Sequence, residues 1–147
     1  MKIAIGCDHG GFEHKNAIVA HLKEQGHEVL DCGIYELATV DYPDIAKKVC
    51  SEIISGNYER GILVCGTGVG MSISANKIKG IRAACLSDHF SAKYTRLHND
   101  SNVLCMGGRV VEIGVAIELA DIFINTEFEG GRHANRVAKI KEIEENN

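Results

Sequence analysis

Short apolar runs rich in β-branched residues alternate along the chain with longer segments of helical periodicity. Five such runs occur, at KIAIGC (2–7), HEVLDC (27–32), GILVCG (61–66), IRAACL (81–86) and NVLCMG (102–107). Runs of this length, bounded by glycine or polar residues, are typical of buried strands. The pattern therefore predicts five strands separated by helices.

In the intervening segments, apolar residues recur at three- and four-residue spacing, which predicts helices with one apolar face. The recurring residues are Ile18 and Leu22, then Ile45, Val49 and Ile53, and later Ile113, Ile117, Ala120 and Ile124. Parallel strands need crossover helices, and those helices cover both faces of a sheet. We therefore expect a Rossmann-like, three-layer, doubly wound α/β fold with a five-stranded parallel sheet. Since no linker or repeat interrupts residues 1–147, we expect them to form a single domain.

A last helix is predicted over 133–145, after the segment EGGRH, and no strand follows it. Val137, Ile140 and Ile143 give this extra C-terminal helix a partial apolar stripe. The stripe is compatible with packing on the helix's own domain or on a second subunit, and the pattern does not decide between them.

The charge of the chain argues against two classes of partner. The net charge is −4, and the Lys and Arg residues are scattered, which is atypical of proteins that bind nucleic acid or an anionic membrane. No apolar stretch approaches the roughly 20 residues needed to span a bilayer, and MKIAIGCDHGG lacks the apolar core of a signal peptide. We expect a cytoplasmic protein.

The six cysteines do not form a recognisable disulfide or metal pattern. They are Cys7, Cys32, Cys50, Cys65, Cys85 and Cys105, and no C-x-x-C pair occurs. A chain this long and apolar needs no disulfide framework, so most of them are expected to be small core residues.

Polar residues and glycines gather where predicted strands end. These strand ends carry Cys7–Gly11, Cys65–Gly70, Ser87–His89 and Gly107–Arg109. Ligands of open α/β sheets bind beyond the carboxyl ends of the strands, so this edge is the expected binding site.

The loop CGTGVG after the third strand carries the most specific signal. Gly66, Gly68 and Gly70 permit a tight turn into a helix beginning near Val69, with several N–H groups pointing into one space. Such a nest suits an anion, or an oxygen that becomes negative during a reaction. A P-loop, a dinucleotide fingerprint and a phosphatase loop all fail by spacing, the last two because Met71 stands where glycine or arginine is required.

Cys65 adjoins these N–H groups, which are expected to favour its thiolate and make it a base or nucleophile. Thr67 adds a hydroxyl in the same turn. A structural turn beside an inert buried thiol is the alternative interpretation.

Two further groups of residues bear on the substrate. Arg132 and Arg136 are four residues apart at a helix start, where cations oppose the helix dipole unless an anion answers them. Arginine suits bidentate phosphate binding, so these two residues predict a phosphate site that Arg109 could join.

Asp8 and His9 end the first strand, where they could hydrogen-bond hydroxyls or help to move a proton. His98 and Asn99 close RLHND before the fifth strand, and a histidine there is either a partner of the helix dipole or a catalyst. A metal site of Asp8, His9 and His14 fits no common spacing, so no metal is expected.

Five motifs, GCDHGGF, VDYP, CGTGVGMSISANK, RLHND and EGGRHANRV, together resemble the ribose-5-phosphate isomerase B family, within a group that includes galactose-6-phosphate isomerase subunits. The match covers nearly the whole chain. The resemblance implies an intramolecular oxidoreductase of the pentose phosphate pathway that interconverts D-ribose 5-phosphate and D-ribulose 5-phosphate through an enediolate, without metal or organic cofactor. It also implies a homodimer, or a dimer of such dimers, with active sites shared between subunits.

By the same resemblance, Cys65 is the base of the cysteine-type branch of the family, and the backbone of the loop stabilises the enediolate. His98 and Thr67 assist ring opening, and the other residues contact the sugar or the phosphate. The full binding set implied is Asp8, His9, Gly66, Thr67, Gly68, Val69, Gly70, Asn99, Arg109, Arg132 and Arg136.

Three alternatives remain open at the level of sequence. The substrate could be a six-carbon sugar phosphate, allose 6-phosphate or galactose 6-phosphate. The chain could also be a non-enzymatic phosphosugar-binding module, which would need the glycine nest and the arginines but no thiol base. A flavodoxin-like or nucleotide-binding carrier is disfavoured, because the chain has no tryptophan and the nucleotide motifs fail by spacing.

Overall fold

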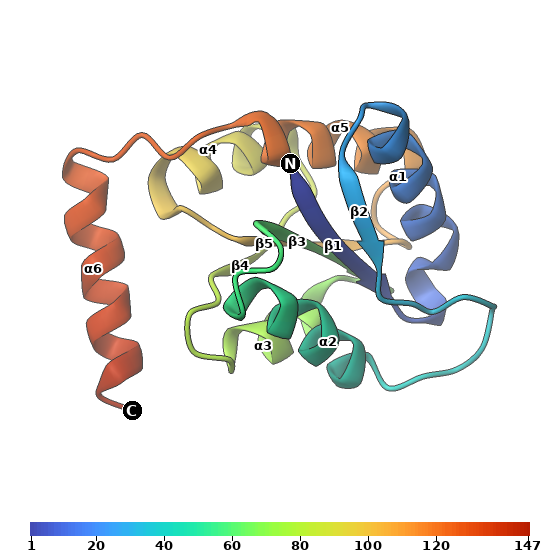
Figure 1. Cartoon of the computed structure of the whole chain (residues 1–147), viewed down its shortest axis with the longest axis horizontal. Helices are drawn as coiled ribbons and strands as arrows, with labels where there is room; N and C mark the ends of the chain where they lie inside the picture. Colours follow the sequence, from blue (N-terminus) through green and yellow to red (C-terminus); the bar gives the residue numbers. More distant parts are fainter.

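The computed structural model describes all 147 residues, and the five predicted strands form one parallel sheet (Figure 1). The strands are β1 (Lys2–Cys7), β2 (Glu28–Asp31), β3 (Arg60–Cys65), β4 (Ala83–Cys85) and β5 (Val103–Gly107), in the order β2-β1-β3-β5-β4. β2 and β4 are shorter than predicted. Both lie at the edges of the sheet, where each pairs with a single neighbour.

Helices cover both faces of the sheet, which confirms the predicted three-layer α/β fold. They are α1 (Phe12–Glu24), α2 (Tyr42–Ile54), α3 (Val69–Asn76), α4 (His89–Asn99), α5 (Ile113–Asn125) and α6 (Arg132–Glu145), with a short 3₁₀ turn, η1 (His9–Gly11), before α1. In Figure 1, α1, α4 and α5 lie on one face, and α2 and α3 lie on the other. No helix is both long enough and apolar enough to cross a lipid bilayer.

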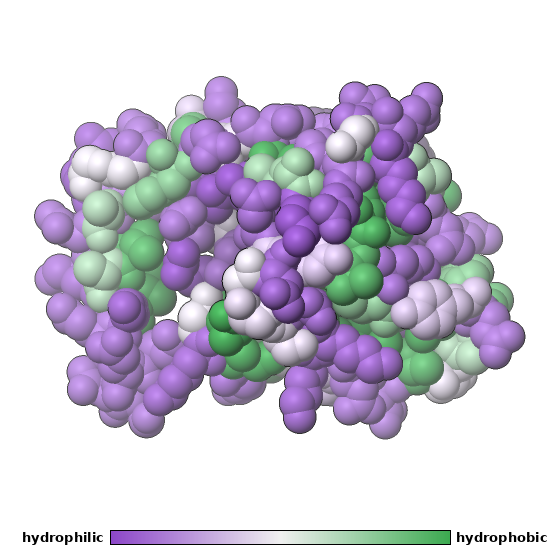
Figure 2. Space-filling model, in the orientation of Figure 1, coloured by the Kyte–Doolittle hydropathy of each residue, from purple (hydrophilic) through white to green (hydrophobic).

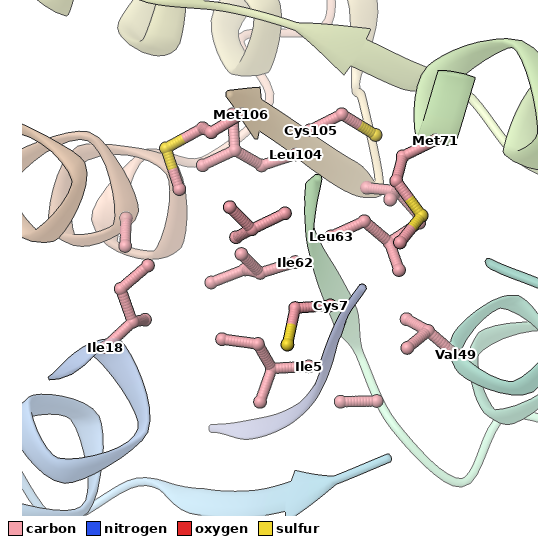
Figure 3. Packing of buried hydrophobic residues seen from close by; sticks show 14 of the residues in the cluster. Ile5, Cys7, Ile18, Val49, Ile62, Leu63, Met71, Leu104, Cys105 and Met106 are labelled. Atoms are coloured by element: carbon pink, nitrogen blue, oxygen red, sulfur yellow. The ribbon is translucent and has the colours of Figure 1, made fainter. Parts of the chain in front are cut away.

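The central strands supply the core, because both of their faces are covered. Every residue of β3 and β5 is buried. Figure 3 shows Ile18 of α1 approaching the sheet from one side, while Val49 of α2 and Met71 of α3 approach from the other. All three side chains are fully buried, as the helical spacing predicted for Ile18 and Val49.

At the carboxyl end of the sheet, the loops after β1, β3 and β5 are in backbone contact. A Cβ on Gly108 would lie 2.3 Å from the carbonyl oxygen of Gly10, and a Cβ on Gly10 would lie 2.8 Å from the nitrogen of Gly66. A Cβ on Gly107 would similarly meet the carbonyl of Thr67 at 2.7 Å. Since real Cβ atoms do not come this close to backbone, glycine is what allows the three loops to meet.

α6 stands apart from the sheet, beside α4, at the left of Figure 1. Its apolar residues Ile140 and Ile143 are 44% and 66% exposed, and a groove of about 810 Å³ separates this part of α6 from the β4 edge. Figure 2 shows hydrophobic residues (green) among hydrophilic ones (purple) at the left of the molecule, the side on which Figure 1 places α6. The helix therefore does not bury its stripe on its own chain, although Glu144 accepts a hydrogen bond from the Gly80 N–H at 3.0 Å.

The loop contact predicts the effect of one added methyl group. In Gly108→Ala, the new Cβ must displace the Gly10 backbone, so we expect the free energy of unfolding to fall by about 2 to 3 kcal/mol. Chemical denaturation monitored by circular dichroism measures this change. The matched control is Gly114→Ala in α5, where a Cβ meets nothing within 4 Å, and the helix should become no less stable. Equal stability of the two variants would contradict the close contact.

Candidate active site

Cys65 is the last residue of β3, and its sulfur lies inside the turn that follows. Its Sγ accepts a hydrogen bond from the N–H of Gly68 at 3.1 Å, and only 5% of the residue is exposed. Gly68 has φ +83°, a left-handed conformation that turns the chain directly into α3. The predicted glycine turn and the predicted helix start at Val69 are both present. The thiol thus lies against the N–H of Gly68, the residue that precedes α3.

Asp8 and His9 approach this loop from the end of β1. The residue pairs Cys7↔Val64 and Cys65↔Gly107 place the ends of β1, β3 and β5 level with one another. Asp8 is 6% exposed, and its Oδ1 accepts a hydrogen bond from the Gly10 N–H at 2.8 Å, which fixes the carboxylate. His9 is exposed beside it.

Arg109 extends over the loop from the end of β5. Its backbone N–H donates to the carbonyl of Gly66 at 3.0 Å, and its Nη1 lies 3.5 Å from the position that a Cβ on Gly66 would occupy. Thr67, next in the loop, is exposed, and its Oγ1 accepts from the N–H of Val69 at 3.3 Å. We call Asp8, His9, Arg109 and the loop Cys65–Gly70 the thiol cluster.

Two residues that we did not predict as site residues also contact the loop. The ring of Tyr42 lies against Gly70, where a Cβ would come within 2.5 Å of its Cε1. Cys85, at the end of β4, is exposed, and its S–H donates to the carbonyl of Thr67 at 3.6 Å. Tyr42 belongs to the motif VDYP, but no spacing in the sequence connects the start of α2 with the loop after β3. Cys85 gave no signal that separated it from core cysteines.

The remaining predicted residues form a second group, which we call the guanidinium cluster: His98 and Asn99 at the end of α4, and Arg132 and Arg136 on α6. The ring of His98 stacks on that of His133, with centroids 4.0 Å apart and planes at 16°. The N–H of Glu129 donates to the carbonyl of Leu97 at 3.1 Å, which ties the segment before α6 to α4.

The two clusters lie at opposite ends of the strands, the thiol cluster at the carboxyl ends and the guanidinium cluster toward the amino ends. α4 ends at Asn99, just before β5 begins at Val103, whereas Cys65 pairs with Gly107 at the end of β5. A five-residue strand spans about 13 Å, so at least this distance separates the two ends of the sheet along the strands. Within one chain, the structure does not bring the predicted catalytic thiol together with His98, Asn99, Arg132 and Arg136.

Both clusters carry guanidinium groups that have no carboxylate partner. The arginines that form ion pairs are Arg60, Arg82 and Arg96. Arg109, Arg132 and Arg136, the other three of the six arginines, form none and are exposed. Arg132 is also the first residue of α6, where free N–H groups and the helix dipole add to the positive potential. The start of α6 therefore carries a positive potential that favours binding of an anion.

His133 is buried at the base of the guanidinium cluster. It is 4% exposed, and its Nε2 has no hydrogen-bond partner. Desolvation, together with the neighbouring His98 and Arg132, lowers the pKa of His133 below its usual value. One group of three side chains could hold a metal ion: His98, Glu129 and His133. Each offers one ligand atom, and these atoms all lie within 4.8 Å of one another.

Comparison with known proteins identifies relatives over the full length of the chain. A family model described as "Ribose/Galactose Isomerase" matches residues 3–140. Ribose-5-phosphate isomerase B of Escherichia coli strain K12 is 49% identical over 144 residues, covering 98% of this chain and 97% of the relative. A Listeria innocua protein named ribose-5-P isomerase B is 46% identical over 147 residues and covers 100% of this chain and 99% of its own length.

Solved structures agree with these relatives. The ribose-5-phosphate isomerase B of Clostridium thermocellum superposes with a TM-score of 0.97 at 49% identity, covering 99% of both chains. The enzyme of Mycoplasma genitalium, solved with bound ribulose-5-phosphate, gives a TM-score of 0.94 at 39% identity and covers 99% of this chain and 97% of that one.

The environments of four of the six thiols predict their order of reactivity. Burial raises the pKa of Cys7 to about 11 and that of Cys50 to about 12, and it raises the pKa of Cys105 well above its usual value. At pH 8 a thiol with a pKa of 11 is ionised in about one molecule in a thousand, so these three should resist iodoacetamide in the folded protein. Peptide mass spectrometry measures the labelling. Exposed Cys85 should react before them, and all six should react in denaturant. Equal labelling of Cys50 and Cys85 in the folded protein would contradict this order.

Proposed function

The chain belongs to the ribose/galactose isomerase family, and from this premise we propose that it interconverts ribose 5-phosphate and ribulose 5-phosphate with Cys65 as the base. The observation that carries the proposal is the hydrogen bond of 3.1 Å from the Gly68 N–H to the Cys65 Sγ. This N–H donor holds the sulfur inside the turn at the start of α3. A sugar oxygen placed beside this sulfur would be close to the other backbone N–H groups of the loop.

The reaction moves one proton between adjacent carbons, and the thiol cluster has a group for each part of it. In the proposed step, the Cys65 thiolate takes the proton from C2 of the open-chain aldose, and the electron pair forms a C1–C2 double bond as the carbonyl oxygen at C1 becomes negative. The N–H groups of Gly66–Gly70 and the guanidinium of Arg109 stabilise that oxygen. The thiol then returns the proton to C1, while the O2 proton passes to the negative oxygen at C1 and C2 becomes the ketone. No atom is gained or lost.

The other residues of the thiol cluster position the sugar in this proposal. The carboxylate of Asp8 is held by the Gly10 N–H and presents its other oxygen to sugar hydroxyls, beside His9. Thr67 lies in the loop itself, so its hydroxyl can assist ring opening together with an imidazole. His98 is assigned to that step by resemblance. In the single chain His98 lies near the amino ends of the strands, away from Cys65.

This separation supports a site assembled from two copies of the chain. Arg132, Arg136, His98 and Asn99 cannot reach the Cys65 of their own chain, but a second copy could present them to it and hold the phosphate. The exposed apolar residues Ile140 and Ile143, and the groove beside them, provide the surface that such a homodimer would bury. A two-fold dimer would complete two identical sites by the same contact.

Replacing the sulfur tests the base. In Cys65→Ala we expect kcat for ribose 5-phosphate to fall by about 10³-fold or more, because no other base lies in the loop, whereas the fold and sugar phosphate binding persist. A coupled assay for ribulose 5-phosphate and calorimetric titration with a sugar phosphate measure the two quantities. Both assays are done with chelator present, and with allose 6-phosphate and galactose 6-phosphate for comparison.

Cys85→Ala is the matched control, since it removes a thiol from the same loop environment without touching the proposed base. It should retain most of the activity. Undiminished turnover in Cys65→Ala would refute the assignment of the base, and loss of activity in both variants with loss of binding would point to a damaged loop instead.

Mixing two inactive variants tests the shared site. Cys65→Ala lacks the proposed base of the thiol cluster. The double variant R132A/R136A lacks the two guanidinium groups that we propose to bind the phosphate. In a hybrid dimer, one site combines both defects and the other has none. Equal mixing with free subunit exchange should therefore restore about a quarter of wild-type activity. Assay of the mixture measures it, and a hybrid isolated by coexpression with two affinity tags should retain about half of wild-type activity. If each chain formed its own complete site, the mixture would stay inactive.

A further inference from the structure

We propose that His98, Glu129 and His133 bind a divalent transition-metal ion such as Zn²⁺, and that the bound ion inhibits the isomerase. The three residues come from two segments that the Glu129–Leu97 backbone hydrogen bond holds together. The Oε2 of Glu129 lies 3.9 Å from the Nε2 of His98 and 3.9 Å from the Nε2 of His133. The reaction proposed above needs no metal, so this site is an addition to it.

The independent sign of a ligand is the orphaned nitrogen of His133. The ring is 4% exposed, and its Nε2 faces the Glu129 carboxylate at a distance too long for a hydrogen bond. Buried polar atoms of folded proteins are almost always satisfied by a partner, and each exception calls for an explanation. A metal ion placed between Nε2 and the carboxylate would supply the missing partner.

The donor set selects the class of ion. Two imidazoles and one carboxylate suit Zn²⁺, Co²⁺ or Ni²⁺, whereas Mg²⁺ and Ca²⁺ prefer all-oxygen sites. Three protein ligands leave the fourth position of a tetrahedral ion open to water or to an anion.

The geometry requires a modest contraction. Ligand atoms around a tetrahedral Zn²⁺ are about 3.4 Å apart, compared with 3.9 to 4.8 Å here. His133 is fixed by burial, so the movement falls on His98 and Glu129, whose side chains are 36% and 56% exposed. The His98 ring must also turn out of its stack with His133 so that both nitrogens point at one ion.

Two nearby cations limit the affinity. Arg132 precedes His133 in α6, and Arg136 follows it by three residues on the same helix. Their repulsion of a metal ion should weaken its binding. The consequence for activity rests on the proposed function: an ion that occupies the His98 imidazole removes it from ring opening, and the ion also competes for the phosphate with the arginines.

Co²⁺ is the probe, because its spectrum reports the identity of the ligands. The full chain is titrated with CoCl₂ and followed by calorimetry and visible absorption. We expect one ion per chain, visible bands typical of four or five ligands, and no sulfur-to-cobalt charge-transfer band in the near ultraviolet. In Glu129→Gln and in His133→Ala the affinity should fall by about tenfold or more. Glu129 is exposed, so its variant should fold even if His133→Ala does not.

The matched control is His89→Ala. His89 is also paired with a carboxylate, with Nε2 2.6 Å from Oε2 of Glu118, but no third ligand is near it, so its loss should leave Co²⁺ binding unchanged. Unchanged affinity in Glu129→Gln, or a sulfur charge-transfer band that disappears in Cys85→Ser, would overturn the site. Inhibition by ZnCl₂ that chelator reverses, and that Glu129→Gln weakens, would support the inhibitory role. If the chain binds Co²⁺ as described but does not isomerise ribose 5-phosphate, the proposed function fails and the metal site stands.

Discussion

The contact between backbones at the carboxyl end of the sheet is the constraint on which the candidate site depends. The loops after β1, β3 and β5 meet at Gly10, Gly66 and Gly108, and a Cβ on Gly10 or Gly108 would collide with the backbone of a neighbouring loop. This contact brings Asp8 and Arg109 to the loop that holds Cys65. In that loop the Gly68 N–H donates to the sulfur. The glycines thus determine both where the thiol lies and which donors surround it.

The same fold separates the two halves of the proposed chemistry. Helices of a parallel α/β sheet run back from the carboxyl edge to the amino edge, so His98 and Asn99, at the end of α4, must lie away from Cys65. α6 then starts beside them and leaves the body of the chain. The sheet places the thiol and its donor, and an appended helix places the arginines that we propose to bind the phosphate. A second chain is the simplest way to bring them to one substrate.

The sequence was sufficient for most of the fold, because the relevant signals are local. Apolar runs identified β1, β3 and β5, and the spacing of Ile18 and Val49 identified helix faces that the structure buries. The glycine loop could be read for the same reason, since Cys65 and its donors are consecutive residues. The spacing of Arg132 and Arg136 predicted a phosphate site, and the family resemblance implied a role for His98 in ring opening. Spacing could not connect these residues with the thiol, since they lie far from it within one chain.

What the sequence did not reveal depends on contacts between distant segments. Tyr42 meets Gly70, and Cys85 meets Thr67, only because α2 and β4 pack against the loop after β3. The stack of His98 on His133 likewise requires the return of the segment before α6 to the end of α4. The exposure of the apolar stripe on α6 is also a property of the whole fold, which explains why its pattern alone was compatible with two packings.

The detached position of α6 has a thermodynamic consequence under the proposed assembly. A sugar phosphate held by the thiol of one chain and the arginines of another binds the pair of chains more tightly than either chain alone. Linkage then requires the substrate to strengthen self-association by the same factor by which self-association strengthens substrate binding. On dilution, the apparent affinity for the sugar phosphate would weaken together with the dimer, so an enzyme built this way would sense its own concentration.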